Sequence, residues 1–429
     1  MQFVESLEPR RLLSSSYIEL PGGSVAGEMS FRHKTFYGGD DGLYVTDGTV
    51  AGSKLLHPFK QVQVWQTSKA TANGYLFFSA DDGITGLELW RTDGTADGTQ
   101  MVADINPGQY QSNLSLQLAY RGKVYFSGFD PTHGQEPYVS DGTAEGTMLL
   151  ADIAPGSANS SPTWFSVSAD HRVYFSAQEQ SDNAQAWVTE GTPATTSKLD
   201  IGDDIVFPGN YLAFKGKTYF VNHDNQLWKT NGTAGGTANV FSVGRAGANN
   251  SIDSLGVFGG RLVFTVQTQS GLISSIFISD GTTAGTHRIA SFGPKSGIWN
   301  HVATRKALIF TVSTPNRKFT LWKSDGTSRG TSKIANLPSG KRVNVDLLTA
   351  SSSKAFLVTE DLATGEKPRI WQTDGTASGT KVIARIPHFS DFHSIFPLYL
   401  NYHLFVSLSF SGTFGQPRPP SHLYLIKTT

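Results

Sequence analysis

The 429-residue sequence contains no cysteine, which excludes disulfide bonds, thiolate metal ligands and a cysteine nucleophile. Charged residues are also scarce, at 16% of the chain, against about 25% in typical soluble domains. The 35 basic residues balance the 35 acidic ones, so no net field draws the chain to nucleic acid or acidic lipid. No apolar run approaches the roughly 20 residues that a membrane-spanning helix needs.

One phrase, typified by LELWRTDGTADGT at 87–99, occurs eight times in this glycine-rich chain. Each copy has an acidic or amide anchor residue, and successive anchors lie 41 to 49 residues apart. A period in this range indicates a repeat architecture, because one four-stranded propeller blade takes about 40–50 residues. The anchors are Asp47, Asp93, Asp141, Glu190, Asn231, Asp280, Asp325 and Asp374.

An aromatic residue always lies three positions before the anchor, where alternation along a strand places it on one face of a sheet. We expect these aromatic side chains to form core between blades rather than a ligand platform. They are Tyr44, Trp90, Tyr138, Trp187, Trp228, Phe277, Trp322 and Trp371.

Gly and Thr follow every anchor, and a second Gly lies five residues after it in seven copies. This pattern predicts a hairpin loop in which the anchor side chain and the Thr hydroxyls accept loop N–H groups. Asn231 keeps the acceptor without the charge. The anchors are therefore predicted to be structural turn residues, not metal ligands or catalytic acids.

Two further short strands precede each phrase and one follows it, with no helical periodicity, as in 114–123, 122–128 and 260–266. Four antiparallel strands in tandem repeat predict an all-β fold, a β-propeller of about nine four-stranded units in one domain over residues 17–429. An open β-solenoid is the alternative. A partial ninth unit (396–429) stops where its fourth strand should begin, and residues 16–20 could supply that strand. The propeller has eight blades if this unit lies outside the ring.

The stretch Glu88–Thr95 (ELWRTDGT) resembles the ELWxxDGT repeat of large bacterial secreted and surface proteins. Residues 7–13 (LEPRRLL) resemble the LEPR-x-L-L leader of bacterial surface proteins, so residues 1–16 are interpreted as a leader-like segment. Both resemblances imply an exported or envelope-associated bacterial protein. The fourth unit departs from the repeat at Glu190, Pro193 and Thr195, and the fifth departs at Asn231, so we expect a different loop there.

Paired aspartates in two loops, Asp40–Asp41 and Asp81–Asp82, are weak candidates for calcium, because carboxylate oxygens are its preferred ligands. They follow neither the EF-hand nor the RTX spacing, and solvated turns are favoured. His388, Asp391 and His393 form the densest histidine cluster, which is interpreted as a loop rather than a transition-metal site. No other cofactor is expected.

No GxSxG, HExxH or phosphate-binding glycine loop is present. Glu88, Arg91, Glu136 and Lys229 flank the repeat strand, but nothing in the sequence brings them together, so no catalytic residue is named. Recognition is expected in the variable hairpins, because loops on a rigid scaffold commonly bind. These hairpins are 128–136, 177–185, 312–319, 358–369 and 408–422.

We expect a monomeric, non-catalytic surface propeller that binds a glycan or a protein. One alternative is a carbohydrate-active enzyme, which would bring two or more carboxylates together. The other is an architectural spacer, which would have no concave pocket with convergent polar groups.

Overall fold

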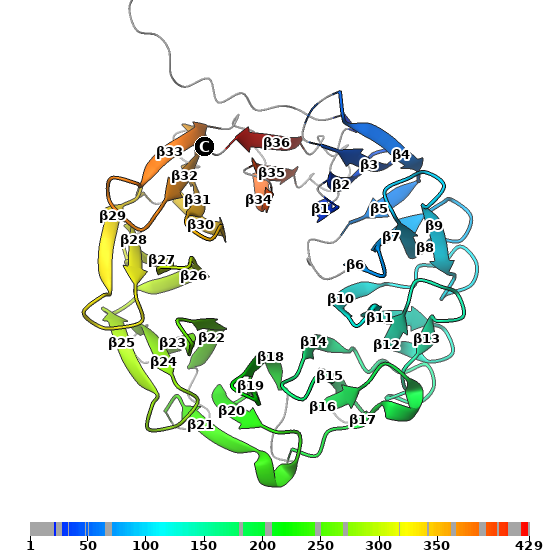
Figure 1. The fold of residues 1–429 in the computed structure, drawn as a ribbon, viewed down its shortest axis with the longest axis horizontal. Helices are drawn as coiled ribbons and strands as arrows, with labels where there is room; N and C mark the ends of the chain where they lie inside the picture. Colours follow the sequence, from blue (N-terminus) through cyan, green and yellow to red (C-terminus); the bar gives the residue numbers. More distant parts are fainter. Residues whose placement is uncertain are drawn as a thin grey trace, which may run out of the picture.

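In the computed structural model, nine antiparallel sheets stand side by side in a ring (Figure 1). The structure describes residues 21–22, 28–32, 34–47, 49, 51–64, 71–179, 183–201, 208–244, 250–268, 273–316, 318–340, 343–361, 366–385, 392–400, 403–410 and 422–427. The predicted β-propeller is confirmed. We number its sheets as blades 1 to 9 in chain order.

Blades 1 to 3 contain the first thirteen strands. Blade 1 comprises β1 (Glu28–Phe31), β2 (Lys34–Gly39), β3 (Gly42–Thr46) and β4 (Lys54–Pro58). Blade 2 comprises β5 (Gln61–Gln63), β6 (Thr71–Ala72), β7 (Tyr75–Asp81), β8 (Leu87–Thr92) and β9 (Gln100–Ala103). Blade 3 comprises β10 (Ser115–Tyr120), β11 (Lys123–Asp130), β12 (Gly134–Ser140) and β13 (Met148–Leu149).

Blades 4 to 6 follow the same plan, with two short 3-10 helices in their last turns. Blade 4 comprises β14 (Thr163–Val167), β15 (Val173–Gln178), β16 (Ala184–Thr189), η1 (Pro193–Thr195) and β17 (Ser197–Lys198). Blade 5 comprises β18 (Gly209–Phe214), β19 (Lys217–Val221), β20 (Gln226–Thr230), η2 (Ala234–Gly236) and β21 (Ala238–Ser242). Blade 6 comprises β22 (Ser251–Phe258), β23 (Arg261–Thr268), β24 (Ile273–Ser279) and β25 (His287–Phe292).

Blades 7 to 9 complete the ring. Blade 7 comprises β26 (Gly297–Ala303), β27 (Leu308–Ser313), β28 (Phe319–Ser324) and β29 (Ser332–Asn336). Blade 8 comprises β30 (Val343–Ala350), β31 (Ala355–Asp361), β32 (Glu366–Thr373) and β33 (Lys381–Arg385). Blade 9 comprises β34 (Phe392–Leu400), β35 (His403–Phe410) and β36 (His422–Lys427).

The partial C-terminal unit forms the ninth blade of the ring. Its first strand, β34, contacts β30 of blade 8 on one side and β1 of blade 1 on the other. Three strands of this blade are described. The predicted fourth strand from residues 16–20 falls outside the described residues. Blade 2 also deviates from the common plan, because β5 and β6 both pair with β7.

The first strand of each blade lies toward the centre of the ring, and in blades 1 to 8 the last strand lies at the rim (Figure 1). Within each meander, the turns after strands one and three lie at one end of the sheet, and the turn after strand two lies at the other. The repeated phrase forms strand three and the turn that follows it. All eight copies of this turn therefore lie on one face of the ring, which we call the turn face.

Apolar side chains cover both faces of strand three, as the sequence predicts. Leu43, Leu89, Leu227, Leu321 and Ile370 are fully buried, four positions before their anchors. The aromatic residues one position later are buried or half-buried, and most stack on an aromatic of strand two, as Tyr138 does on Phe126. Burying one such side chain contributes about 1.5–3 kcal/mol, so packing between blades holds the ring together.

The described residues contain no α-helix. Accordingly, no helix in this part of the chain is long and apolar enough to cross a membrane.

Candidate functional site

The anchor aspartates hold the turns through the same three hydrogen bonds in every blade that has Asp or Asn at this position. In blade 2, Asp93 Oδ1 accepts from the N–H of Thr95 at 2.9 Å and from its hydroxyl at 2.7 Å. The Thr95 hydroxyl in turn accepts from the N–H of Gly98 at 2.9 Å. The same bonds occur in the turns anchored by Asp47, Asp141, Asn231, Asp280, Asp325 and Asp374.

The hydrogen bonds from Thr lower the pKa of the anchor carboxylates below its ordinary value, in Asp93 and Asp325 for example. Asn231 nevertheless accepts the same two bonds from the N–H and hydroxyl of Thr233 without a charge, and the Thr233 hydroxyl accepts the third bond from Gly236 N. The turn therefore requires an acceptor oxygen and not an anion.

The second glycine of the phrase lies directly against the anchor side chain. A Cβ added at Gly98 would overlap the carboxylate of Asp93, and the other six glycines at this position meet their anchors in the same way. The residue five positions after the anchor must therefore lack a side chain wherever the anchor is Asp or Asn.

Blade 4 replaces both members of this pair. Glu190 stands at the anchor, and Thr195 stands where the other turns have glycine. The Thr195 hydroxyl accepts from the N–H of Thr192 at 3.3 Å and contacts the Thr192 hydroxyl at 2.9 Å. The Thr195 side chain thus takes the place that the anchor carboxylate has in the other turns. Its hydroxyl contacts the same two groups of Thr192, from the residue five positions after the anchor. The departures at Glu190 and Thr195 are one compensated change.

In blades 2 to 8, the turn also docks on the preceding blade. The first glycine of the phrase has a positive φ, such as 97° at Gly142, and an added Cβ there would contact Phe77 of blade 2. Arg91 Nη1 donates to Gly142 O at 2.5 Å, and Lys229 Nζ donates to Gly281 O at 3.3 Å. Two candidates for a polar site, Arg91 and Lys229, therefore fasten neighbouring blades.

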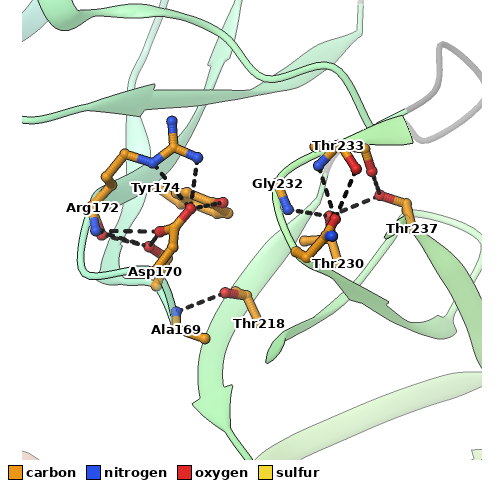
Figure 2. A network of polar contacts seen from close by, with 11 residues as sticks. Ala169, Asp170, Arg172, Tyr174, Thr218, Thr230, Gly232, Thr233 and Thr237 are labelled. Carbon is orange, nitrogen blue, oxygen red and sulfur yellow. Dashed lines mark hydrogen bonds and ion pairs between the residues drawn. The ribbon is translucent and has the colours of Figure 1, made fainter. Parts of the chain in front are cut away.

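The seam between blades 4 and 5 has a polar cluster of its own (Figure 2). Asp170 accepts from Arg172 and from the Tyr174 hydroxyl, and the N–H of Ala169 donates to Thr218 Oγ1 across the seam at 2.9 Å. Figure 2 shows these residues beside the blade 5 turn that contains Gly232 and Thr233. The Asp170 carboxylate is held by residues of its own blade, and the hydrogen bond across the seam comes from the backbone of the preceding residue, Ala169.

Glu88 and Glu136 occupy equivalent positions in blades 2 and 3 and are fully buried. The Glu88 carboxylate accepts from the N–H of Ile105 at 2.8 Å and from the Ser112 hydroxyl at 2.7 Å. Glu136 accepts from Ile153 N, Ala154 N and Ser160 in the same manner. Each carboxylate anchors the connection that leads to the next blade, and the structure does not bring the two into one site.

Burial raises the pKa of Glu88 to about 7, despite the hydrogen bonds that favour the charged form. Burial raises the pKa of Glu136 in the same direction. A raised carboxyl pKa is typical of catalytic acids but also of buried structural carboxyls. Here the donors to both groups come from the chain itself, which accounts for the burial without a substrate.

The weak calcium candidates lie in the turns after strand two, on the face opposite the turn face. Asp81 Oδ1 accepts from Gly83 N at 2.7 Å, and Asp82 Oδ1 accepts from Ile84 N and Thr85 N. Asp40 and Asp41 lie in the corresponding turn of blade 1 and are exposed. Across the described ranges, no three His, Asp or Glu side chains are grouped closely enough to hold a metal ion.

His388 and Asp391 lie outside the described residues, and His393 lies in β34, where side chains are not described. Among the variable hairpins, the turn at 131–133 is described: Asp130 accepts from Thr132 N, His133 N and the Tyr138 hydroxyl. The hairpins around 180–182, 362–365 and 411–421 fall outside the described residues.

A concave pocket of about 680 Å³ lies on the turn face between blades 7 and 8. Ala307 and Ile309 line this seam, where earlier seams carry aromatic residues such as Phe77 and Tyr125, and the smaller side chains leave the space open. The lining includes both cationic and anionic side chains, namely Lys306, Lys323, Lys354, Asp325 and Asp374. The mixed charges favour no single class of ligand.

Trp164 was not predicted as a candidate from the sequence, because it lies outside the repeated phrase. Trp164 on β14 is 51% exposed and has a φ of 62°. Its only signal in the sequence is a tryptophan in a first strand, a position at which most units have none.

No family model matches this chain, and no curated protein matches it. Among solved structures, it is similar to a computationally designed protein, Ika8, at 12% identity, with 95% of this chain and 97% of that chain covered and a TM-score of 0.45. A prolyl endopeptidase is similar at 10% identity over 80% of this chain and 54% of that chain (TM-score 0.45). Oligogalacturonate lyase in complex with manganese is similar at 11% identity over 72% and 86% (TM-score 0.41). Likenesses this distant carry no argument about activity.

Proposed function

We propose that this chain is a non-catalytic β-propeller, exported to the bacterial surface or secreted, that binds a glycan or a protein partner. The contrast between the two faces of the ring supports this proposal most. The turn face repeats one set of hydrogen bonds, whereas the described turns after strand two in blades 2, 3 and 5 are each built differently. Asp82 caps one such turn, Asp130 and His133 form another, and Asn222 pairs with Gln226 in a third. Variable loops on a rigid ring are the usual place of recognition.

A carbohydrate-active enzyme is the alternative that the raised pKa of Glu88 could favour. Such an enzyme needs two carboxyl groups flanking one bond of the substrate. Glu88 and Glu136 each accept hydrogen bonds from their own blade's outgoing connection. Their environments support a structural role, and with it the non-catalytic proposal.

The test is binding of the purified full-length chain to an array of bacterial and algal polysaccharides and to envelope proteins, with calcium or with EDTA. We expect a reproducible partner whose mass is unchanged after incubation. Cleavage of the bound glycan would support the enzyme instead. A blank result with every probe would favour an architectural spacer. Loss of binding in EDTA would support calcium binding at the paired aspartates Asp40, Asp41, Asp81 and Asp82.

Export is tested separately by fusing residues 1–16, with and without the LEPRRLL stretch, to a reporter protein. We expect the intact segment to direct the reporter to the envelope or medium. Equal retention of both fusions in the cytoplasm would contradict a leader role.

A further inference from the structure

The innermost strands of blades 3 to 8 each contain a register shift against strand two, and those of blades 4, 5 and 6 share one form of it. In β14, β18 and β22, two residues face a single phenylalanine of strand two, so that the pairing register shifts. The first residue of each bulge adopts left-handed backbone geometry: φ is 62° at Trp164, 55° at Asn210 and 56° at Ser254. Bulges of this kind re-aim side chains and are frequent near functional sites. The three strands are neighbours toward the centre of the ring (Figure 1).

The side chains at this repeated backbone position differ in a telling way. Asparagine tolerates left-handed geometry, whereas for a bulky residue such as tryptophan it is an outlier. Holding such a residue there costs stability. Trp164 gains little packing in return, because 51% of its surface is exposed. Fold stability therefore does not explain a tryptophan at this position.

Trp164 rests on the next blade rather than pointing freely into solvent. A Cβ added at Gly209 of β18 would lie 3.0 Å from the indole Nε1 and 3.1 Å from Cδ1. The equivalent residues in blades 4 and 6 are Thr163 and Asp253. Glycine at 209 is thus what allows the indole to lie across the seam between blades 4 and 5. Blade 5 therefore lies against one side of the indole ring of Trp164, and the other side is exposed to solvent.

The exposed side chains around the equivalent bulge positions of β18 and β22 are polar and carry no positive charge. Asn210 and Ser254 are exposed, and their side chains have no hydrogen bond to another described residue. Asp253 is exposed and accepts from the Ser251 hydroxyl at 2.7 Å. None of the three strands contains Lys or Arg. The row therefore offers an aromatic face, an amide, a hydroxyl and a carboxylate.

We infer that Trp164, Asn210 and Ser254 form a binding site for a neutral oligosaccharide. The face of an aromatic ring is electron-rich and attracts the partly positive C–H groups on the flat side of a pyranose. Amide and hydroxyl groups on the next two blades hydrogen-bond to sugar hydroxyls. Asp253 and the absence of cations disfavour anionic sugars. A proline-rich peptide would need a groove with several aromatic residues, and these strands expose only one. The inference rests on the proposed function and gives it a ligand class.

The test uses the full-length chain and calorimetric titration with cello-, laminari-, xylo- and mannohexaose, with a galacturonate hexamer as the anionic comparison. We expect at least one neutral hexasaccharide to bind and to change the indole fluorescence. Trp164→Gly should weaken that binding by at least about tenfold, in line with the loss of one aromatic contact worth about 1.4 kcal/mol. The same substitution should raise the melting temperature, because glycine adopts left-handed geometry without strain.

Two further variants separate the site from general damage. Trp164→Phe should retain part of the affinity, and Tyr110→Ala, which removes a side chain that is 72% exposed elsewhere, should retain all of it. A melting temperature lowered by Trp164→Gly would overturn the inference, because it would show a packing role. Unchanged affinity in that variant, or preference for the galacturonate hexamer, would overturn it too. If the wild type binds another array partner but no neutral hexasaccharide, this inference fails while the proposed function stands. If the wild type binds nothing at all, both fail.

Discussion

The turn face and the inner strands of blades 4 to 6 both repeat a backbone, and they use the repetition in opposite ways. In the turns, the side chains repeat along with the backbone, and even in the exception at Glu190 the Thr195 hydroxyl contacts the N–H and hydroxyl of Thr192 as an anchor oxygen does elsewhere. In the inner strands, the same bulge position holds a different residue in each blade: Trp164, Asn210 and Ser254. Identical chemistry at equivalent positions indicates the requirements of the fold. Different chemistry on an identical backbone indicates recognition.

The largest expected effect comes from breaking the pairing of anchor and glycine. Gly98→Thr forces a side chain into the Asp93 carboxylate and should lower the free energy of unfolding by about 2–3 kcal/mol. Adding Asp93→Glu rebuilds the blade 4 arrangement and should recover at least about 1 kcal/mol as coupling between the two sites. Urea unfolding of both variants, with Asp97→Ser as a control in the same turn, measures this. A double variant no more stable than Gly98→Thr alone would refute the compensation.

Glu88 and Glu136 distinguish blades 2 and 3 from the others. Glu88→Gln replaces one acceptor oxygen by an amide donor that faces the N–H and hydroxyl donors, and should cost about 1–3 kcal/mol. Because burial raises the pKa of Glu88 from 4.5 to about 7, the folded protein binds more protons than the unfolded chain in this window. Wild-type stability should therefore fall as pH rises from 4.5 to 7. Melting temperatures over this range should show a flatter profile in Glu88→Gln, and identical profiles would contradict the burial account.

The seams provide the third comparison. Arg91→Ala removes the hydrogen bond to Gly142 O and a guanidinium placed 4.2 Å from the centre of the Tyr75 ring, and should cost about 1–2 kcal/mol. Lys323 occupies the equivalent position at the pocket between blades 7 and 8, and Lys323→Ala should change stability by less than about 0.5 kcal/mol. Equal losses in the two variants would show that the seams are fastened alike.

The smallest effect is expected from removing a charge in the turn. Asp93→Asn reproduces what Asn231 already does in blade 5 and should alter stability at pH 7 by no more than about 0.5 kcal/mol. The lowered pKa of Asp93 contributes stability above its ordinary value of 3.8, and this contribution is lost as pH falls. The variant should therefore resist acid slightly better than the wild type. A large loss of stability at neutral pH would show that the charge of Asp93 is needed, as it would be for a metal ligand.

The repeat period, the four-stranded unit and the ninth blade could be predicted from the sequence, because each blade needs the same alternation and the same turn. The docking of Gly142 on Phe77 could not, since it joins positions in different units that no spacing relates. The buried hydrogen bonds of Glu88 were hidden for the same reason: the donor at Ser112 lies beyond the repeated phrase. No repeated sequence pattern marks the position of Trp164 in the other units, so only the bulge with left-handed geometry, shared by three strands, showed that this position is equivalent to Asn210 and Ser254.

The most direct test of the account measures melting temperature and oligosaccharide affinity on the same preparations of two variants, Asp93→Ala and Trp164→Gly. We expect the two variants to show opposite patterns. Asp93→Ala should lower the melting temperature and leave the affinity unchanged, whereas Trp164→Gly should raise the melting temperature and weaken binding. If affinity depended on Asp93, or if Trp164→Gly lost stability and kept its affinity, the division between a structural turn face and a binding inner row would be wrong.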